Sequence, residues 1–122
     1  MAGQIVHFEL PAENAERAKE FWGSLFGWTF NDAGVEGMAY AMTDAGGPPP
    51  GAIYASEELA AQGPIVYFDT DDINASVARA RELGGQAEDP APIPGIGWFA
   101  RCHDTEENRF SLFQSDESAG AS

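Results

Sequence analysis

The order of hydrophobic and polar residues predicts two strand–helix units that begin about sixty residues apart. Residues 4–10 alternate between apolar and polar side chains, which is typical of a strand with one buried face. Residues 65–70 repeat this pattern, and each run is followed by apolar residues at helical spacing that end in glycine. The chain therefore contains a duplicated unit, and at 122 residues its two copies must share one domain.

In the first copy, Pro11 is expected to end the strand, Asn14 to cap the helix and Gly27 to terminate it. Four residues at helical spacing are expected to point toward the core: Ala18, Phe21, Trp22 and Leu25. The opposite side of this helix carries charged residues, so the pattern predicts a helix that covers one face of a sheet.

Shorter segments complete the first copy. Residues 28–31 and 38–42 are predicted to form a hairpin of two short strands. Residues 44–51 contain three consecutive prolines and are predicted to be a loop, because proline cannot donate to a sheet ladder. A short apolar strand at 51–55 follows, and then a linker with a helical turn around 57–61.

The second copy repeats this plan, with Asp71 or Asp72 as the helix cap. Three residues of its helix are expected to point inward: Val77, Ala80 and Leu83. The segments expected after it are a strand at 86–89, a loop at 90–97 and paired strands at 98–103 and 109–114. Each copy thus has the order β-α-β-β-β.

The predicted fold is α+β, with two βαβββ modules at 4–56 and 64–114 inside a single domain that spans 4–114. Residues 115–122 are expected to be a flexible acidic tail. Since a helix covers one face of each half-sheet, the two uncovered faces are expected to form a curled mixed sheet around a central cleft.

Strand alternation places His7, Glu9 and Tyr67 on the faces that point to this cleft. His7 has two interpretations: a half-buried histidine that is hydrogen-bonded to a neighbour, or a residue that contacts a ligand or transfers a proton. A carboxylate next to His7 is expected to raise its pKa toward neutrality. Four aromatic residues on strands are candidates for stacking a flat ligand: Tyr40, Tyr54, Tyr67 and Trp98.

Two further expectations concern aromatic and sulfur side chains. Phe21 and Trp22 lie at helical spacing and are expected in the core. Cys102 has no basic neighbour in sequence, so burial is favoured over a nucleophilic function. The sequence leaves open which face of the strand at 98–103 lines the cleft.

Acidic residues outnumber basic ones by 20 to 6, and the net charge is −14. This charge argues against binding to nucleic acid or to anionic membranes, both of which need clustered lysine and arginine. A single cysteine cannot form an intrachain disulfide, and no stretch reads as a signal peptide or a membrane span. We expect a cytoplasmic protein whose partner is a small molecule.

Three motifs carry a resemblance to a known family. An LFGW run follows an H-x6-N-x6-FW motif, YFDTDDI precedes ELGG, and DTEENRFSLFQ closes the second copy. The H-x6-N-x6-FW motif is made by His7, Asn14, Phe21 and Trp22. With these motifs the chain resembles the vicinal oxygen chelate superfamily, which includes glyoxalase I, extradiol dioxygenases and bleomycin-resistance proteins. Thr105 and Glu107 depart from the family's usual Asp-Pro-Asp-Gly-Asn ending.

The resemblance implies one divalent metal ion held by four side chains, one from each of the first, fourth, fifth and eighth strands. The matching residues are His7 in the first, Ile65 in the fifth and Ser111 in the eighth. The fourth position falls within 46–56, which contains no Asp, Glu, His or Cys. One imidazole does not hold a divalent metal, so we expect no metal and no cofactor.

Three hypotheses of function follow. The first is a metal-free protein that binds a small, partly apolar or aromatic molecule through His7, Tyr40, Tyr54, Tyr67, Trp98 and Ser111. The second is a metal-free isomerase or lyase that uses His7 with Glu9 or Tyr67 for proton transfer. The third is a metal-dependent enzyme of the glyoxalase or dioxygenase type with relocated ligands. A homodimer is expected because open sheet edges favour pairing.

Overall fold

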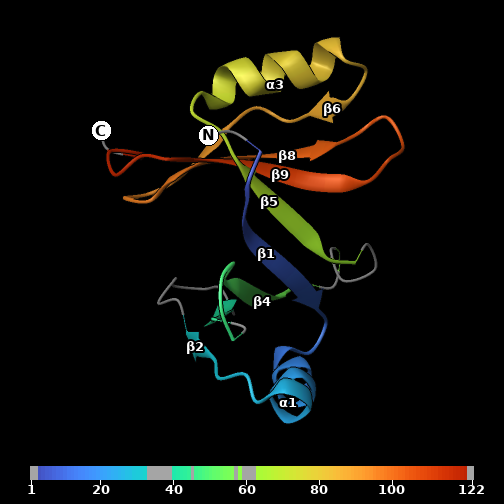
Figure 1. Ribbon diagram of the computed structural model, residues 1–122, viewed down its shortest axis with the longest axis vertical. Helices are drawn as coiled ribbons and strands as arrows, with labels where there is room; N and C mark the ends of the chain where they lie inside the picture. The colour runs from blue at the N-terminus through green and yellow to red at the C-terminus, as the bar shows by residue number, and fades with distance from the viewer. Residues whose placement is uncertain (1–2, 33–39, 45, 57, 59–62, 121–122) are drawn as a thin grey trace. The chain divides into compact units, whose positions relative to one another are not determined.

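In the computed structural model the chain divides into two compact units, Val6–Ile65 and Val66–Ser122 together with Met1–Ile5. The structure describes residues 3–32, 40–44, 46–56, 58 and 63–120. Both units are α+β, and in each of them a first strand is followed by a helix and then by further strands (Figure 1). The predicted helical turn at 57–61 lies outside the described residues except for residue 58.

The first unit has a four-stranded sheet in the order β2-β3-β4-β1 among its described residues. Strand β1 runs parallel to β4, whereas β2 with β3 and β3 with β4 are antiparallel. The elements are β1 (Ile5–Ala12), α1 (Ala15–Phe26), β2 (Asn31–Asp32), β3 (Tyr40–Thr43) and β4 (Gly51–Ala55).

The second unit repeats this topology. Its strands follow the order β5-β9-β8-β6, with β7 also paired to β8. Strand β5 runs parallel to β9, and the other pairs are antiparallel. The elements are β5 (Ile65–Asp69), α3 (Ile73–Glu82), β6 (Gln86–Ala87), β7 (Ala91–Ile93), β8 (Gly97–His103) and β9 (Arg109–Ser115). In both units the first strand pairs in parallel with the last, so the sequence repeat is a repeat of topology.

The predicted helix boundaries are confirmed. The side chain of Asn14 accepts a hydrogen bond from the backbone N–H of Arg17 at 3.0 Å, which caps α1. Gly27 has a positive φ of 75° at the other end, and its N–H donates to the carbonyl of Gly23. Asp72 caps α3 in the same way by accepting from the N–H of Ala75.

The prediction that Pro11 ends the first strand is wrong, because β1 continues through Ala12. The N–H of Phe8 donates to Pro50, and the N–H of Ser56 donates to the carbonyl of Ala12. Alternate residues of a strand point their backbone groups to the same side, so the even-numbered residues of β1 bond to β4. Pro11 is odd-numbered, and its missing N–H therefore removes no bond to β4.

The predicted inner face of α1 is wrong in part, because Phe21 and Leu25 are exposed. The helix is oriented instead by Trp22, whose ring stacks on Trp28 with 5.4 Å between centroids. The ring of Phe8 on β1 also packs near that of Trp28, with 6.1 Å between their centroids. Stacking of these large rings turns Phe21 and Leu25 to the outer side of the helix.

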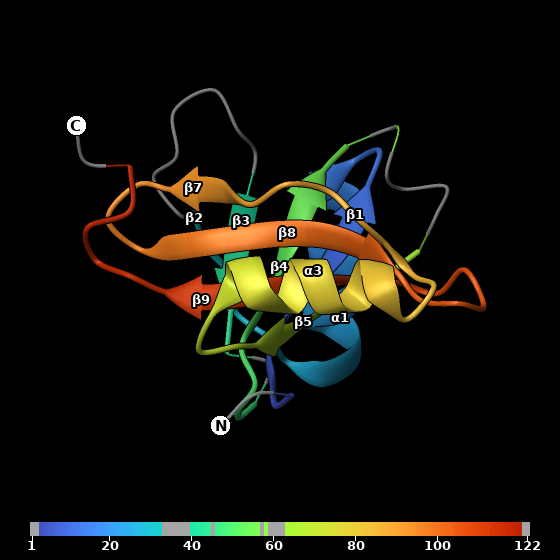
Figure 2. The ribbon, with the colours of Figure 1, turned by 90° about the horizontal axis from the view of Figure 1, so that it is seen from above.

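Helix α3 covers one face of β8 and β9 (Figures 1 and 2). The buried core there consists of Ile73, Val77, Ala100 and Cys102, with Trp98, Phe110 and Leu112 packed against it. The even-numbered residues of β8 face α3, and Phe99, Arg101 and His103 lie on the opposite face. Leu83, expected to point inward, is the C-cap residue that follows α3 and is exposed.

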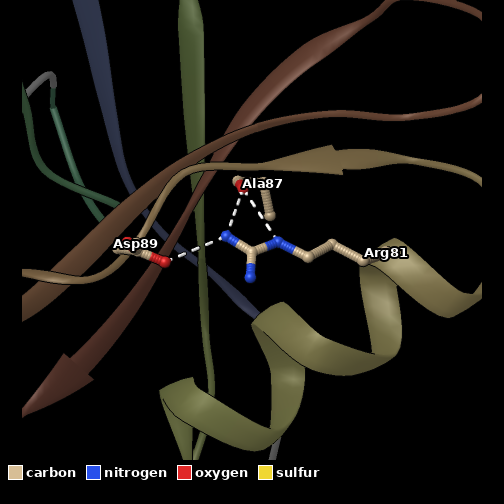
Figure 3. A network of polar contacts seen from close by, with 3 residues as sticks. All are labelled: Arg81, Ala87 and Asp89. Atoms are coloured by element: carbon tan, nitrogen blue, oxygen red, sulfur yellow. Dashed lines mark hydrogen bonds and ion pairs between the residues drawn. The ribbon is translucent and has the colours of Figure 1, made fainter.

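Arg81 fastens the end of α3 to the strand that follows it, as Figure 3 shows. Its guanidinium donates to the carbonyl oxygen of Ala87 through Nε at 3.1 Å and Nη2 at 2.7 Å. Nη2 also lies 3.1 Å from the carboxylate of Asp89. These bonds commit Arg81 to a structural function.

The prediction of a simple loop at 90–97 is wrong, because β7 forms an antiparallel pair with β8. A tight turn joins them, in which the N–H of Ile96 donates to the carbonyl of Ile93 and Gly95 adopts a φ of 75°. Pro92 is tolerated because, among the described strands, β7 pairs with β8 alone and so lies at an edge.

The described part of the predicted tail at 115–122 is residues 115–120: Ser115 is the last residue of β9, and residues 116–120 make hydrogen bonds to this turn. The N–H of Asp116 donates to Ile96, and the N–H of Gly95 donates to Ala119. The flexibility expected of the tail and the curling of the half-sheets around a cleft stay predictions. No helix in the described part of the chain is long and apolar enough to cross a membrane.

Replacing Gly51 by alanine is expected to destabilise the first unit, because the new Cβ would lie 2.2 Å from Cζ of Phe8. Such overpacking costs about 1–3 kcal/mol of unfolding free energy, which urea denaturation measures. In a Phe8→Leu background the ring is gone, so Gly51→Ala should cost clearly less. An equal loss in both backgrounds would contradict the close contact.

Candidate functional site

The sheet face of the first unit that lies opposite Phe8 carries most of the predicted site residues. His7 and Glu9 project from β1 on this face, since they alternate with Phe8. Tyr40 on β3 is the cross-strand partner of Tyr54 on β4, and their ring centroids are 5.8 Å apart. The structure thus brings together four residues that the sequence placed on three separate strands.

Three of these side chains form a hydrogen-bonded chain. The Tyr40 hydroxyl donates to Oε2 of Glu9 at 2.6 Å, and Nε2 of His7 lies 2.7 Å from the same hydroxyl. Because the phenol proton is given to Glu9, the phenol oxygen accepts the proton of Nε2, and Nδ1 carries the imidazole lone pair. We refer to this arrangement as the His7–Tyr40–Glu9 chain.

The burial of Glu9 explains why the His7–Tyr40–Glu9 chain forms. Glu9 is only 6% exposed, and a buried carboxylate costs free energy unless a donor binds it. The phenol of Tyr40 supplies a short bond of the strong, charge-assisted kind. The His7 and Tyr40 rings are nearly parallel, with 17° between their planes and 6.3 Å between their centroids.

The electrostatic expectation for His7 is wrong in its net direction. Burial lowers the pKa of His7 below its ordinary value of 6.5, and the negative charge of Glu9 opposes this lowering only in part. The imidazole is therefore neutral at pH 7. Sequence reasoning identified the carboxylate neighbour but had no measure of how deeply the ring is buried.

The remaining predicted residues lie in the second unit and do not share one face. Tyr67 and Ser111 are cross-strand partners on β5 and β9, and both are buried on the face opposite α3. Trp98 packs on the α3 side of β8, where its Nε1 donates to Asp116 at 3.0 Å. We leave Trp98 out of the candidate site because it belongs to the core beneath α3.

Cys102 is buried in the same core, as the sequence predicted. Burial raises the pKa of its thiol to about 11, so the nucleophilic thiolate is scarce at neutral pH. The thiol donates a weak hydrogen bond to the carbonyl of Ala100. Cys102 is therefore a packing residue.

The residues at the four metal-ligand positions implied by the resemblance do not fit a metal ion. Ile65 presents a buried hydrocarbon, and β4 offers the phenol of Tyr54 as its one polar side chain. Beside His7, the set contributes only the weakly coordinating hydroxyl of Ser111. Within the residues that the structure describes, no group of three or more His, Cys, Asp or Glu side chains is arranged to hold a metal.

Titration of His7 tests the His7–Tyr40–Glu9 chain directly. We expect NMR of the imidazole protons to give His7 a pKa below 6.5, and Glu9→Gln to lower it further, because the carboxylate charge supports the protonated ring. Glu13→Gln, which removes an exposed carboxylate of the same unit, is the matched control and should leave the value unchanged. A pKa above 6.5, or one insensitive to Glu9→Gln, would contradict the described environment.

Comparison with known proteins gives the family. The model of the glyoxalase-like domain matches residues 6–113. A glyoxylase-like domain-containing protein of Didymella fabae is 31% identical over 118 residues, covering 90% of this chain and 92% of its own. The anthracycline biosynthesis protein DnrV of Streptomyces peucetius is 30% identical over 98 residues, which cover 75% of this chain but only 34% of that protein.

A solved structure agrees in fold. Streptomyces coelicolor methylmalonyl-CoA epimerase, in complex with 2-nitronate-propionyl-CoA, aligns with a TM-score of 0.65 and 20% identity over 94% of this chain and 96% of its own. At this identity the likeness concerns the fold alone. The family match spans nearly the whole chain and agrees with the motifs around His7 and Asn14. This chain belongs to the glyoxalase-like domain family of the vicinal oxygen chelate superfamily.

Proposed function

We propose that the first unit binds a small, partly apolar or aromatic molecule, and that it does so without the family's usual metal ion. The observation that carries this proposal is the His7–Tyr40–Glu9 chain beside the ring of Tyr54. A ligand site combines apolar surface with a few fixed polar groups, and this face offers both.

The aromatic part of the face is formed by Tyr40 and Tyr54, which are half-buried and whose ring planes are inclined by 52°. The polar part is fixed at both ends, since Glu9 anchors the phenol and the phenol anchors His7. Groups held in this way lose little conformational entropy when a ligand binds. The face therefore suits a flat molecule that carries a carbonyl or hydroxyl oxygen.

One relative supports a ligand of this kind. DnrV is named for anthracycline biosynthesis, and anthracyclines are flat aromatic molecules. A homodimer and a cytoplasmic location stay predictions.

A thermal-shift series with flat aromatic ketones, quinones and an anthracycline tests this proposal. A compound that binds the native state raises Tm by an amount that grows with the logarithm of its concentration relative to Kd. Tyr40→Phe should abolish the shift for the best compound, and it should also destabilise the ligand-free protein by about 1–3 kcal/mol because Glu9 loses its donor. Each shift is therefore measured against the same variant without ligand, and Glu13→Gln serves as the control.

Two results would overturn the proposal. One is a panel in which no compound raises Tm at millimolar concentration, or a shift that survives in Tyr40→Phe. The other is stoichiometric metal in protein purified without a tag, which would favour an enzyme with relocated ligands.

The hydrogen-bonded chain itself favours a second candidate function, a metal-free isomerase or lyase. If Nδ1 of His7 takes a proton from a carbon next to a carbonyl group, Nε2 can pass its proton to the phenol of Tyr40. The phenol proton then moves to Glu9, so that the carboxylate ends protonated and the substrate becomes an enolate. Reversal of these transfers returns a proton to the carbon.

Proton exchange in D2O measures this activity without knowledge of the natural substrate. Aryl ketones incubated with the protein should lose their α-proton NMR signals faster than in buffer, and Glu9→Gln should slow this exchange by about a hundredfold or more. Glu13→Gln should exchange like the unmodified protein. Exchange at the buffer rate would remove the isomerase candidate and leave the binding proposal intact.

A further inference from the structure

The second unit gathers two of the chain's six basic residues on the sheet face opposite α3. Arg101 on β8 pairs with Ser111 on β9, and Ser111 pairs in turn with Tyr67 on β5. These three residues form one row across three strands. Arg109 lies two residues before Ser111 on β9 and therefore on the same face.

This concentration of positive charge is unusual in a chain with a net charge of −14. Three of the four basic residues on the helices form ion pairs: Lys19 with Glu16, Arg79 with Glu82, and Arg81 with Asp89. Arg101, by contrast, makes no ion pair within the described residues. Its guanidinium lies instead 5.7 Å from the ring centroid of Phe99.

Ser111 supplies an independent observation. Its side chain is fully buried, and its hydroxyl has no hydrogen-bond partner in the part of the chain that the structure describes. Buried hydroxyl groups are nearly always hydrogen-bonded, because an unmet one loses its bonds to water. A hydroxyl without an acceptor, beside an arginine without an ion pair, is suited to an anionic oxygen from a ligand.

The next row on the same face consists of Asp69, Phe113 and Phe99, which pair across β5, β9 and β8. The carboxylate of Asp69 accepts a hydrogen bond from the backbone N–H of Gln4 at 2.9 Å. Phe99 and Phe113 are cross-strand partners directly beside the Arg101–Ser111 pair, and both are half-buried. Arginine prefers flat, two-oxygen acceptors such as carboxylates, and phenylalanine rings favour an aromatic group. The Arg101–Ser111 pair and the two phenylalanines therefore lie two residues apart along their strands, on one face.

We propose that this face binds a small aryl carboxylate. Arg101 donates to the carboxylate, the Ser111 hydroxyl donates to one of its oxygens, and the aromatic ring packs on Phe99 and Phe113. Arg109 adds a second positive charge on the same face. The proposal goes beyond the function proposed for the first unit, and it stands or falls on the second unit alone.

The exposure of Arg101, Ser111 and Tyr67 indicates from which end of this row the ligand enters. Arg101 is exposed whereas Ser111 and Tyr67 are buried, so the ligand approaches at the Arg101 end. Because Ser111 is fully buried, the proposal requires neighbouring side chains to shift before the carboxylate can reach its hydroxyl.

Binding of benzoate, followed by calorimetry and by NMR shifts of the full-length protein, tests the proposal. Benzamide has the same ring without the charge and should bind at least about tenfold more weakly, as should acetate, which lacks the ring. Arg101→Gln and Ser111→Ala should each weaken benzoate binding by about tenfold or more. Arg79→Gln removes the same charge from exposed α3 and is the matched control, which should bind benzoate normally.

Ser111→Ala separates a ligand site from a packing defect. Removal of a buried, unpaired hydroxyl should leave the Tm of the ligand-free protein unchanged or raise it, while benzoate binding falls. Normal benzoate binding by Ser111→Ala or Arg101→Gln would overturn the proposal. So would equal losses in Arg79→Gln and Arg101→Gln, or no benzoate binding at millimolar concentration.

Discussion

The first unit depends on one hydrogen bond, from the phenol of Tyr40 to the buried carboxylate of Glu9. A carboxylate inside a sheet is stable only when a donor replaces the water that it has lost. Tyr40 is that donor, and the bond fixes the direction of its hydroxyl. The hydroxyl in turn fixes which nitrogen of His7 carries the proton. A single need for charge compensation thus orders three side chains from two strands.

The two units share a topology but differ in the chemistry of their uncovered faces. In each unit the first strand pairs in parallel with the last, and apolar residues gather on the sheet face that the helix covers. The uncovered face of the first unit carries imidazole, phenol and carboxylate, whereas that of the second carries guanidinium, hydroxyl and phenol. The backbone pattern is the same in both units, whereas the polar side chains on the two faces differ.

Local rules predicted much of this fold from the sequence. Caps such as Asn14 and Asp72 depend on neighbouring residues, and strand alternation correctly placed His7 and Glu9 together on the face opposite Phe8. The errors concern tertiary packing. The continuation of β1 through Pro11 depends on which edge meets β4, and the exposure of Phe21 depends on how Trp22 stacks.

The sequence predicted the residues of the candidate site but not the hydrogen bonds between them. Tyr40 was identified as an aromatic surface, whereas its hydroxyl is what joins His7 to Glu9. No local pattern links residues more than thirty positions apart, because the register of β3 on β4 decides their contact. For the same reason the pKa of His7 was assigned the wrong direction, since burial by distant residues outweighs the adjacent charge.

A double-mutant cycle on Tyr40 and Glu9 tests the central interaction most directly. The unfolding free energies of Tyr40→Phe, Glu9→Gln and the double variant give the coupling between the two side chains. A coupling of about 1–3 kcal/mol, with the double variant less destabilised than the sum of the single ones, is the result that a buried charge-assisted bond predicts. Additive losses, within about 0.5 kcal/mol, would show that Glu9 does not depend on Tyr40 and would contradict this account.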